Sequence, residues 1–200
     1  MWKFLSRWGK PDPFVYLLTL MTIWLTAPGM AKADTIQNKT TIDGEVIFGV
    51  NSYGGVIPTV TRSGSNTIMS DRVRLNIKTT FTGKDRLKIQ FQSSNSTPLN
   101  TSVTGTNMTR SGYDVATGNN TNLSLLQYTF PIDSQTKLTA EIIGCGFSEN
   151  FNNFNPLLAS SGSGATSRFG RYNPIYRLSN DGTGITLDRQ LSPELGVATG

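Results

Sequence analysis

Five basic side chains recur at alternate positions in the middle of the chain, and they are the first residues whose spacing suggests chemistry. Arg72, Arg74 and Lys78 alternate with apolar residues. Arg86 and Lys88 repeat the pattern after a short gap. A row of cations attracts anions and donates hydrogen bonds to polar solutes, as in the lining of a pore. The same row is also typical of the solvated face of an ordinary strand, so both interpretations stay open.

Residue types that support catalysis are few. The chain has no histidine, which removes Ser-His and Cys-His pairs and the commonest general base near neutral pH. Cys145 is the single cysteine, so neither an intramolecular disulfide nor a thiolate metal cluster is expected. Glu141 alternates with Ile142, and we expect it on the polar face, paired with a basic residue. The sequence therefore predicts no enzyme, no cofactor and no metal site.

The elements that carry these residues are predicted to be strands. Beyond Asp34 no segment keeps the apolar spacing of a helix, whereas alternation with period two recurs. Residues 71–81 and 85–92 alternate in this way around Thr82-Gly83-Lys84, which predicts a β-hairpin with one apolar and one basic face. Further strands are predicted over residues 44–50, 123–132, 137–145, 184–191 and 194–200.

Short and long connections alternate between these predicted strands. Residues 82–84 and 132–134 form short turns, whereas residues 94–122 and 148–167 are long and polar. Strands of about 9–11 residues joined in this manner are typical of outer-membrane barrels, which have short periplasmic turns and longer external loops. We therefore predict an all-β fold, an antiparallel transmembrane β-barrel.

The first 33 residues have the features of a secretion signal. A basic start is followed by an apolar run of about 12 residues, from Phe14 to Leu25, which is shorter than the ~20 residues of a spanning helix. Ala31-Lys32-Ala33 then matches the small-x-small cleavage pattern. We expect residues 1–33 to be removed during export. An uncleaved membrane anchor is the alternative.

The charge of the chain gives no argument for a nucleic-acid partner. The formal net charge is +5, but four basic residues and one acidic residue lie in the first 33 positions, so only +2 remains beyond the leader. That remainder is too weak and too scattered for nucleic-acid binding.

Four stretches, taken in order, resemble one known family. The first is residues 74–95, with the motif Thr80-Phe81-Thr82-Gly83-Lys84-Asp85, and the others are residues 126–131, 168–176 and 184–193. They are similar to the cyanobacterial outer-membrane iron-uptake porins, which are grouped with the carbohydrate-selective OprB porins. The resemblance covers roughly residues 71–200.

The resemblance implies a passive diffusion channel in the outer membrane for small hydrophilic solutes, either carbohydrates or inorganic ions including iron. Its expected partners are these solutes and the outer-membrane lipid. The pore-lining candidates are Arg72, Arg74, Lys78, Arg86, Lys88 and Glu141.

Two departures from the family change the expected organisation. Residues 34–70 form a lead-in too short for the surface-layer-homology module, so peptidoglycan binding is in doubt. Residues 71–200 supply about half of the family's strands, so we expect the N-terminal portion of a barrel. The remaining barrel half or a second copy would have to close it.

Two other functions are alternatives to the porin. A secreted or surface-displayed β-sandwich for adhesion or sugar binding also suits a chain rich in Ser, Thr, Asn and Gly. An outer-membrane enzyme suits it least, because such active sites usually contain histidine.

Overall fold

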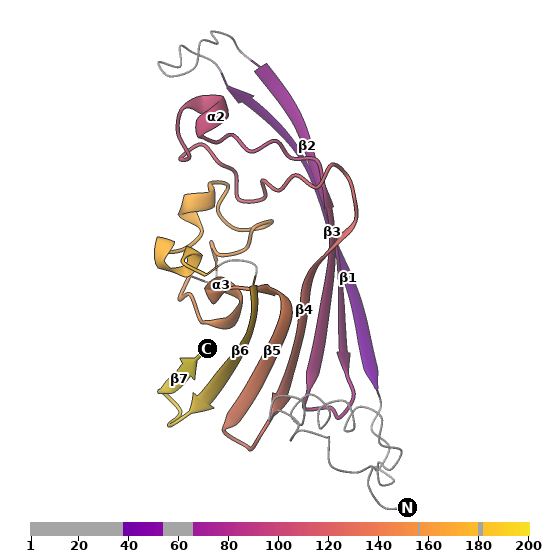
Figure 1. Cartoon of the computed structure of the whole chain (residues 1–200), viewed down its shortest axis with the longest axis vertical. Coiled ribbons are helices and arrows are strands. Elements are labelled where there is room, and N and C mark those ends of the chain that lie inside the picture. The colour runs from indigo at the N-terminus through magenta and orange to yellow at the C-terminus, as the bar shows by residue number, and fades with distance from the viewer. Residues whose placement is uncertain (1–37, 54–65, 156, 180–181) are drawn as a thin grey trace, which may run out of the picture. The chain divides into compact units, whose positions relative to one another are not determined.

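One antiparallel sheet makes up most of the described chain. The computed structural model describes residues 38–53, 66–155, 157–179 and 182–200, and the expected leader lies outside them. Seven strands pair strictly in sequence order (Figure 1). They are β1 (Lys39–Tyr53), β2 (Asn66–Thr80), β3 (Arg86–Ser94), β4 (Asn122–Pro131), β5 (Thr136–Cys145), β6 (Gly182–Gln190) and β7 (Gly196–Thr199). The prediction of an all-β antiparallel fold is confirmed. The sheet is open, with β1 and β7 at its edges.

The first two strands are longer than the alternation predicts. Both β1 and β2 span 15 residues, and they pair from Lys39 opposite Thr80 to Tyr53 opposite Asn66. The added segments are mostly polar, so they give no hydrophobic signal, although threonine favours extended backbone. The sheet therefore begins at Lys39, inside residues 34–70.

Short and long connections alternate between the two ends of the sheet, as predicted. Residues 81–85, 132–135 and 191–195 form the turns at one end. At the other end, residues 95–121 contain α2 (Thr101–Thr104). Residues 146–181 contain α3 (Phe147–Asn150) and the 3₁₀ helices η1 (Arg168–Gly170) and η2 (Pro174–Arg177). Both long connections fold back over the same side of the sheet (Figure 1).

Side-chain carboxylates close two of the turns. Asp85 Oδ1 accepts hydrogen bonds from the backbone N–H groups of Phe81 and Thr82, at 3.0 and 2.7 Å. Gly83 has a φ of +76° in this turn, which favours glycine. In the next turn, Asp133 Oδ1 accepts from the N–H groups of Gln135 and Thr136, both at 2.7 Å. These interactions explain why the polar residues between the strands form tight turns.

The two faces of the sheet are inverted relative to a water-soluble protein. Among the described residues only three apolar side chains are buried, those of Leu99, Leu125 and Tyr172, against twelve polar or charged ones. The other face exposes a band of large apolar side chains: Ile42, Val46, Phe48, Val50, Met69, Val73, Leu75, Ile142, Ile185 and Val197. The described chain thus buries polar side chains and exposes apolar ones.

A bulge bends β5 beside the covered face. The pairing of β5 with β6 shifts between Glu141 and Cys145, and Gly144 there has a φ of +82°. A Cβ at this glycine would lie 2.6 Å from the Ser124 carbonyl oxygen. Only glycine fits the close approach of β4 and β5 at this point. Across the described residues, no helix is long and apolar enough to span a membrane.

Candidate functional site

The six pore-lining candidates all lie on the covered, polar side of the sheet. Because side chains alternate along a strand, Arg72, Arg74 and Lys78 share this face of β2. In β3, Lys88 lies opposite Lys78 and Gln92 opposite Arg74, so the basic row continues across the hairpin. The expected common face is confirmed, but the residues divide into two groups with different surroundings.

Arg72 is the most deeply buried member of the row. Its exposed fraction is 0%, and its Nη2 donates to Glu45 Oε1 of β1 at 2.5 Å. Its Nε and Nη1 have no hydrogen-bond partner among the described residues. A buried cation with two unpartnered donors is costly, because each lost hydrogen bond to a charged group is worth about 1.5–3 kcal/mol.

Arg74 is held by neutral groups. Its Nε donates to Gln92 Oε1 at 2.6 Å, and its Nη1 donates to Ser161 Oγ, in the second long connection, at 2.9 Å. No carboxylate of the described residues lies within ion-pair distance of it. The guanidinium is therefore fixed in place without being neutralised.

The rest of the row lies nearer the short turns and is partly neutralised. Lys78 and Lys88 face each other across β2 and β3, an arrangement that is unfavourable for like charges. Each has an acidic partner: Asp43 Oδ2 lies 2.8 Å from Lys78, and Glu149 Oε2 lies 3.5 Å from Lys88. Arg86 is exposed at the start of β3 and lines a separate hollow of about 340 Å³.

Glu141 has a structural role that the sequence did not predict. Only 1% of it is exposed, and the expected basic partner is absent among the described residues. Its Oε1 instead accepts from Gln127 Nε2 at 2.5 Å, and its Oε2 accepts from Asn150 Nδ2 at 2.7 Å. Because Asn150 is the last residue of α3, this carboxylate connects the second long connection to the sheet. The expected ion pair was wrong, because side-chain amide groups donate to both oxygens of the carboxylate.

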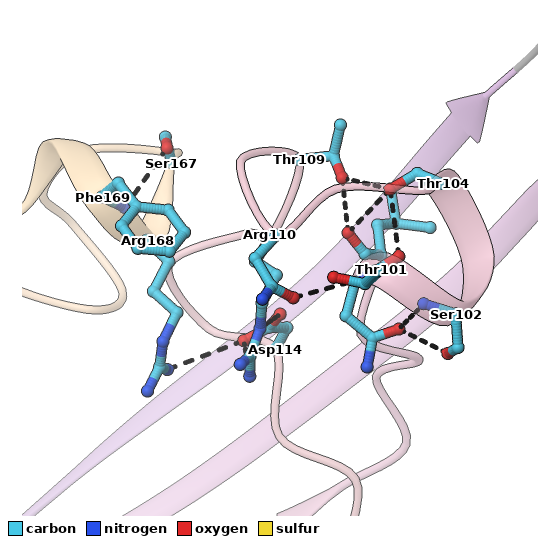
Figure 2. A network of polar contacts seen from close by, with 12 residues as sticks. Thr101, Ser102, Thr104, Thr109, Arg110, Asp114, Ser167, Arg168 and Phe169 are labelled. Carbon is cyan, nitrogen blue, oxygen red and sulfur yellow. Dashed lines mark hydrogen bonds and ion pairs between the residues drawn. The ribbon is translucent and has the colours of Figure 1, made fainter. Parts of the chain in front are cut away.

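The two long connections are joined to each other. Gly112 N–H donates to the Thr166 carbonyl at 2.7 Å, and Arg168 N–H donates to the Arg110 carbonyl at 2.9 Å. Asp114 contacts both Arg110 and Arg168 (Figure 2). Its carboxylate lies 2.8 Å from Arg110 Nε and 3.7 Å from Arg168 Nη1. Asp114 is only 3% exposed, so it holds the connections together from within.

Hydroxyl groups stabilise the first connection near this junction. Thr104 Oγ1 lies 2.6 Å from Thr109 Oγ1, and Thr109 Oγ1 donates to the Leu99 carbonyl at 2.5 Å (Figure 2). Further along, Tyr113 Oη lies 3.2 Å from Ser70 Oγ on β2. The first connection is therefore held by hydrogen bonds within itself and to strand β2 of the sheet.

Between the sheet and the two long connections lies a hollow of about 440 Å³, here called the arginine hollow. It is lined by Arg72, Arg74, Arg168, Arg171 and Arg177, and by one acidic residue among those described, Glu149. Strands β2, β3, β4 and β5 supply one side, and the two connections supply the other. Several guanidinium groups thus line one small volume, and this arrangement favours a negatively charged ligand.

The arginines of the second connection are ordered by aromatic rings. The Arg171 guanidinium lies 4.8 Å from the centre of the Tyr172 ring, and that of Arg177 lies 4.6 Å from the same ring. The Arg171 Nε donates to the Ala159 carbonyl at 2.8 Å. No periodic pattern in the sequence singles out these arginines as members of one site. The available signal was three arginines among aromatics within ten residues.

Aromatic residues near the strand ends fall into two groups. Tyr128 and Phe130 pack together near the turn end of β4, with ring centres 5.7 Å apart, and Phe81 lies 6.4 Å from Tyr128. Phe147 and Tyr172 belong to the second long connection, where Phe147 packs on Phe151 and Tyr172 on Tyr176.

Comparison with known proteins gives one informative relative. The chain is 32% identical over 183 residues to an uncharacterized protein of Synechocystis sp. (strain ATCC 27184 / PCC 6803 / Kazusa). The match covers 84% of this chain, and the chain spans about a third of the relative, 33% of its length. No family model matches the chain, and no solved structure matches it.

Proposed function

We propose that this chain forms part of the wall of an outer-membrane channel through which small hydrophilic solutes diffuse passively. The observation that carries the proposal is the inversion of the sheet's two faces. In water an exposed face with side chains such as Phe48 and Met69, 85% and 79% exposed, would be unfavourable and prone to association. Against hydrocarbon the same face is favourable, and the polar face lines the aqueous side.

The length and connectivity of the strands support the same function. Strands β3 to β5 have 9 or 10 residues, and a tilted strand needs about 9–11 to cross hydrocarbon. Neighbours in sequence are neighbours in the sheet, which is the connectivity of up-and-down membrane barrels. The edges of β1 and β7 require further strands, because unpaired backbone groups are costly in lipid. The remaining half of the barrel or a second copy would supply them.

The inward-folded connections fit a channel that is narrowed by its own loops. They cover the polar face, and their arginines face those of the wall across the arginine hollow. The resemblance to cyanobacterial porins supports this function as well, and carbohydrates or inorganic ions including iron are proposed as solutes on that ground. The β-sandwich alternative needs two packed sheets, whereas the described strands form one.

Fractionation and conductance test the proposal. The full chain, leader included, is produced in a bacterium with an outer membrane, and the membrane fraction is washed with carbonate. We expect the chain to stay in the outer membrane and, once purified, to produce discrete conductance steps in planar lipid bilayers. The heat-unfolded sample serves as the control without steps. A chain released as a soluble protein by osmotic shock would overturn the proposal in favour of a secreted module.

A further inference from the structure

The arginine hollow has the features of a ligand site because two of its cations, Arg74 and Arg171, are held in place without a paired carboxylate. Arg74 is positioned by Gln92 and Ser161, and Arg171 by the carbonyl of Ala159 and the ring of Tyr172. Neither lies within ion-pair distance of a carboxylate of the described residues. Neutral acceptors therefore fix the directions of both guanidinium groups.

The unpartnered donors of Arg72 are a second, independent indication of a ligand. The side chain is completely buried and lines the hollow, yet its Nε and Nη1 have no partner in the part of the chain that the structure describes. Buried polar groups of native proteins almost always have a partner, from the protein, from water or from a ligand. Nη2 is already bound to Glu45. The other two donors have no acceptor, and an acceptor that reaches them from the hollow must displace neighbouring atoms, because both donors have almost no accessible surface.

The electrostatics of the second connection favour the same kind of guest. Burial lowers the pKa of Arg171, the neighbouring charges of Arg168 and Arg72 lower it further, and Tyr172 and Glu149 oppose this shift. Because a guanidinium stays protonated in proteins, the lowered pKa means that the positive charge is held at a cost. An anion between these side chains would relieve that cost.

We propose that the arginine hollow binds a phosphate group, either as inorganic phosphate or on a small organic phosphate, between Arg72, Arg74 and Arg171. Several guanidinium forks around one small volume match the oxygens of a phosphate, which accepts paired N–H···O bonds. The volume of about 440 Å³ lies within the range of small-molecule sites. The proposal deepens the proposed channel function, since it names the class of solute that the channel would select.

Direct binding of inorganic phosphate tests the site. The full chain is refolded in detergent micelles, and binding is measured by calorimetry at low ionic strength, with sodium chloride of equal ionic strength as the reference. We expect saturable phosphate binding that chloride does not reproduce. The variants Arg171→Met and Arg72→Lys should weaken it at least about tenfold, the latter because lysine keeps the charge but loses the paired donors. Arg189→Met removes the same charge from an exposed site on β6 and should bind as wild type.

The outcomes separate this proposal from the channel function. Circular dichroism first establishes that each variant is folded, and if Arg72→Lys is not, Arg171→Met decides alone, since it alters only a connection. No saturable binding by the folded wild type, or equal binding by Arg171→Met, overturns the site. Binding without conductance would refute the channel and leave the site standing, and conductance without binding would do the reverse. Competition between inorganic phosphate and glucose 6-phosphate shows which source of the phosphate group is preferred.

Discussion

Asp85 illustrates how one side chain shapes the first hairpin. Its Oδ1 accepts from Thr80 Oγ1 and Thr82 Oγ1 at 2.9 and 2.7 Å, in addition to the two backbone groups, and its Oδ2 accepts from Tyr128 Oη at 2.8 Å. Burial opposes ionisation of this carboxylate, but the hydrogen bonds from Thr82, Tyr128 and Thr80 outweigh it and hold the pKa well below its ordinary value. The ionised form therefore connects the turn to the wall at β4.

This arrangement predicts a pH-dependent contribution to stability. The folded-state pKa of Asp85 is lower than the unfolded value of about 3.9, so the carboxylate stabilises the fold at any pH above about 4. The contribution is lost as the pH falls from there toward the folded pKa. We expect Asp85→Asn to lower the free energy of unfolding by about 2 kcal/mol at neutral pH, and the difference from wild type to shrink in acid.

Urea unfolding of the full chain in detergent micelles, followed across pH, measures this effect. Asp188→Asn is the matched control, because Asp188 on β6 makes no side-chain hydrogen bond within the described residues. A constant difference between Asp85→Asn and wild type from neutral to acid pH would contradict the role of the charge.

At the scale of elements, the strands could be predicted and the covering connections could not. Alternation in 71–81 and 85–92 depends only on neighbouring residues, so β2 and β3 and their two faces follow from the sequence. The pairing of Arg72 with Glu45 depends on the register of β1, which no local pattern reveals. The arginine hollow depends further on two connections without periodicity, and that is why Arg177 and Asp114 were missed.

The contact between the two connections predicts that they open together. Asp114 carries a buried charge between Arg110 and Arg168, and Asp114→Asn keeps its shape but removes the charge. Losing charge-assisted hydrogen bonds of this kind costs about 1.5 kcal/mol or more, which corresponds to about a tenfold rise in the open population.

Limited trypsin digestion of the folded chain should therefore cut the variant about ten times faster after Arg110 and also after Arg168, since cleavage follows the open population when opening is rapid. Asp188→Asn should be cut at the wild-type rate. Faster cleavage in one connection alone would show that the two move independently.

In the molecule as a whole, the polar face of the sheet is covered by the chain's own long connections, whereas the apolar face is open. The long connections supply hydrogen bonds and ion pairs to the polar face, including those of Glu141 and Arg74. Among the described residues, no second sheet or helix layer covers the apolar face. Its natural environment in this proposal is lipid, and that environment makes substitutions on the two faces unequal.

Leu75→Arg tests this inequality directly. Leu75 lies on the exposed apolar face, 42% exposed, opposite Phe91 of β3. In the proposed channel, about 10 residues of a tilted strand cross the hydrocarbon, and Leu75 would lie near the middle of the crossing part of β2. A charge near the midplane of the bilayer costs about 2–4 kcal/mol. The free energy of unfolding of the variant in phospholipid vesicles should therefore be lower by this amount.

Lys88→Ser is the counterpart on the polar face. It gives up only a partly exposed ion pair with Glu149, worth about 1 kcal/mol or less, and should fold almost as wild type while the anion preference of the channel in a salt gradient decreases. If Leu75→Arg inserted normally and Lys88→Ser blocked insertion, the lipid-facing side would be the wrong one and this hairpin would not be a channel wall.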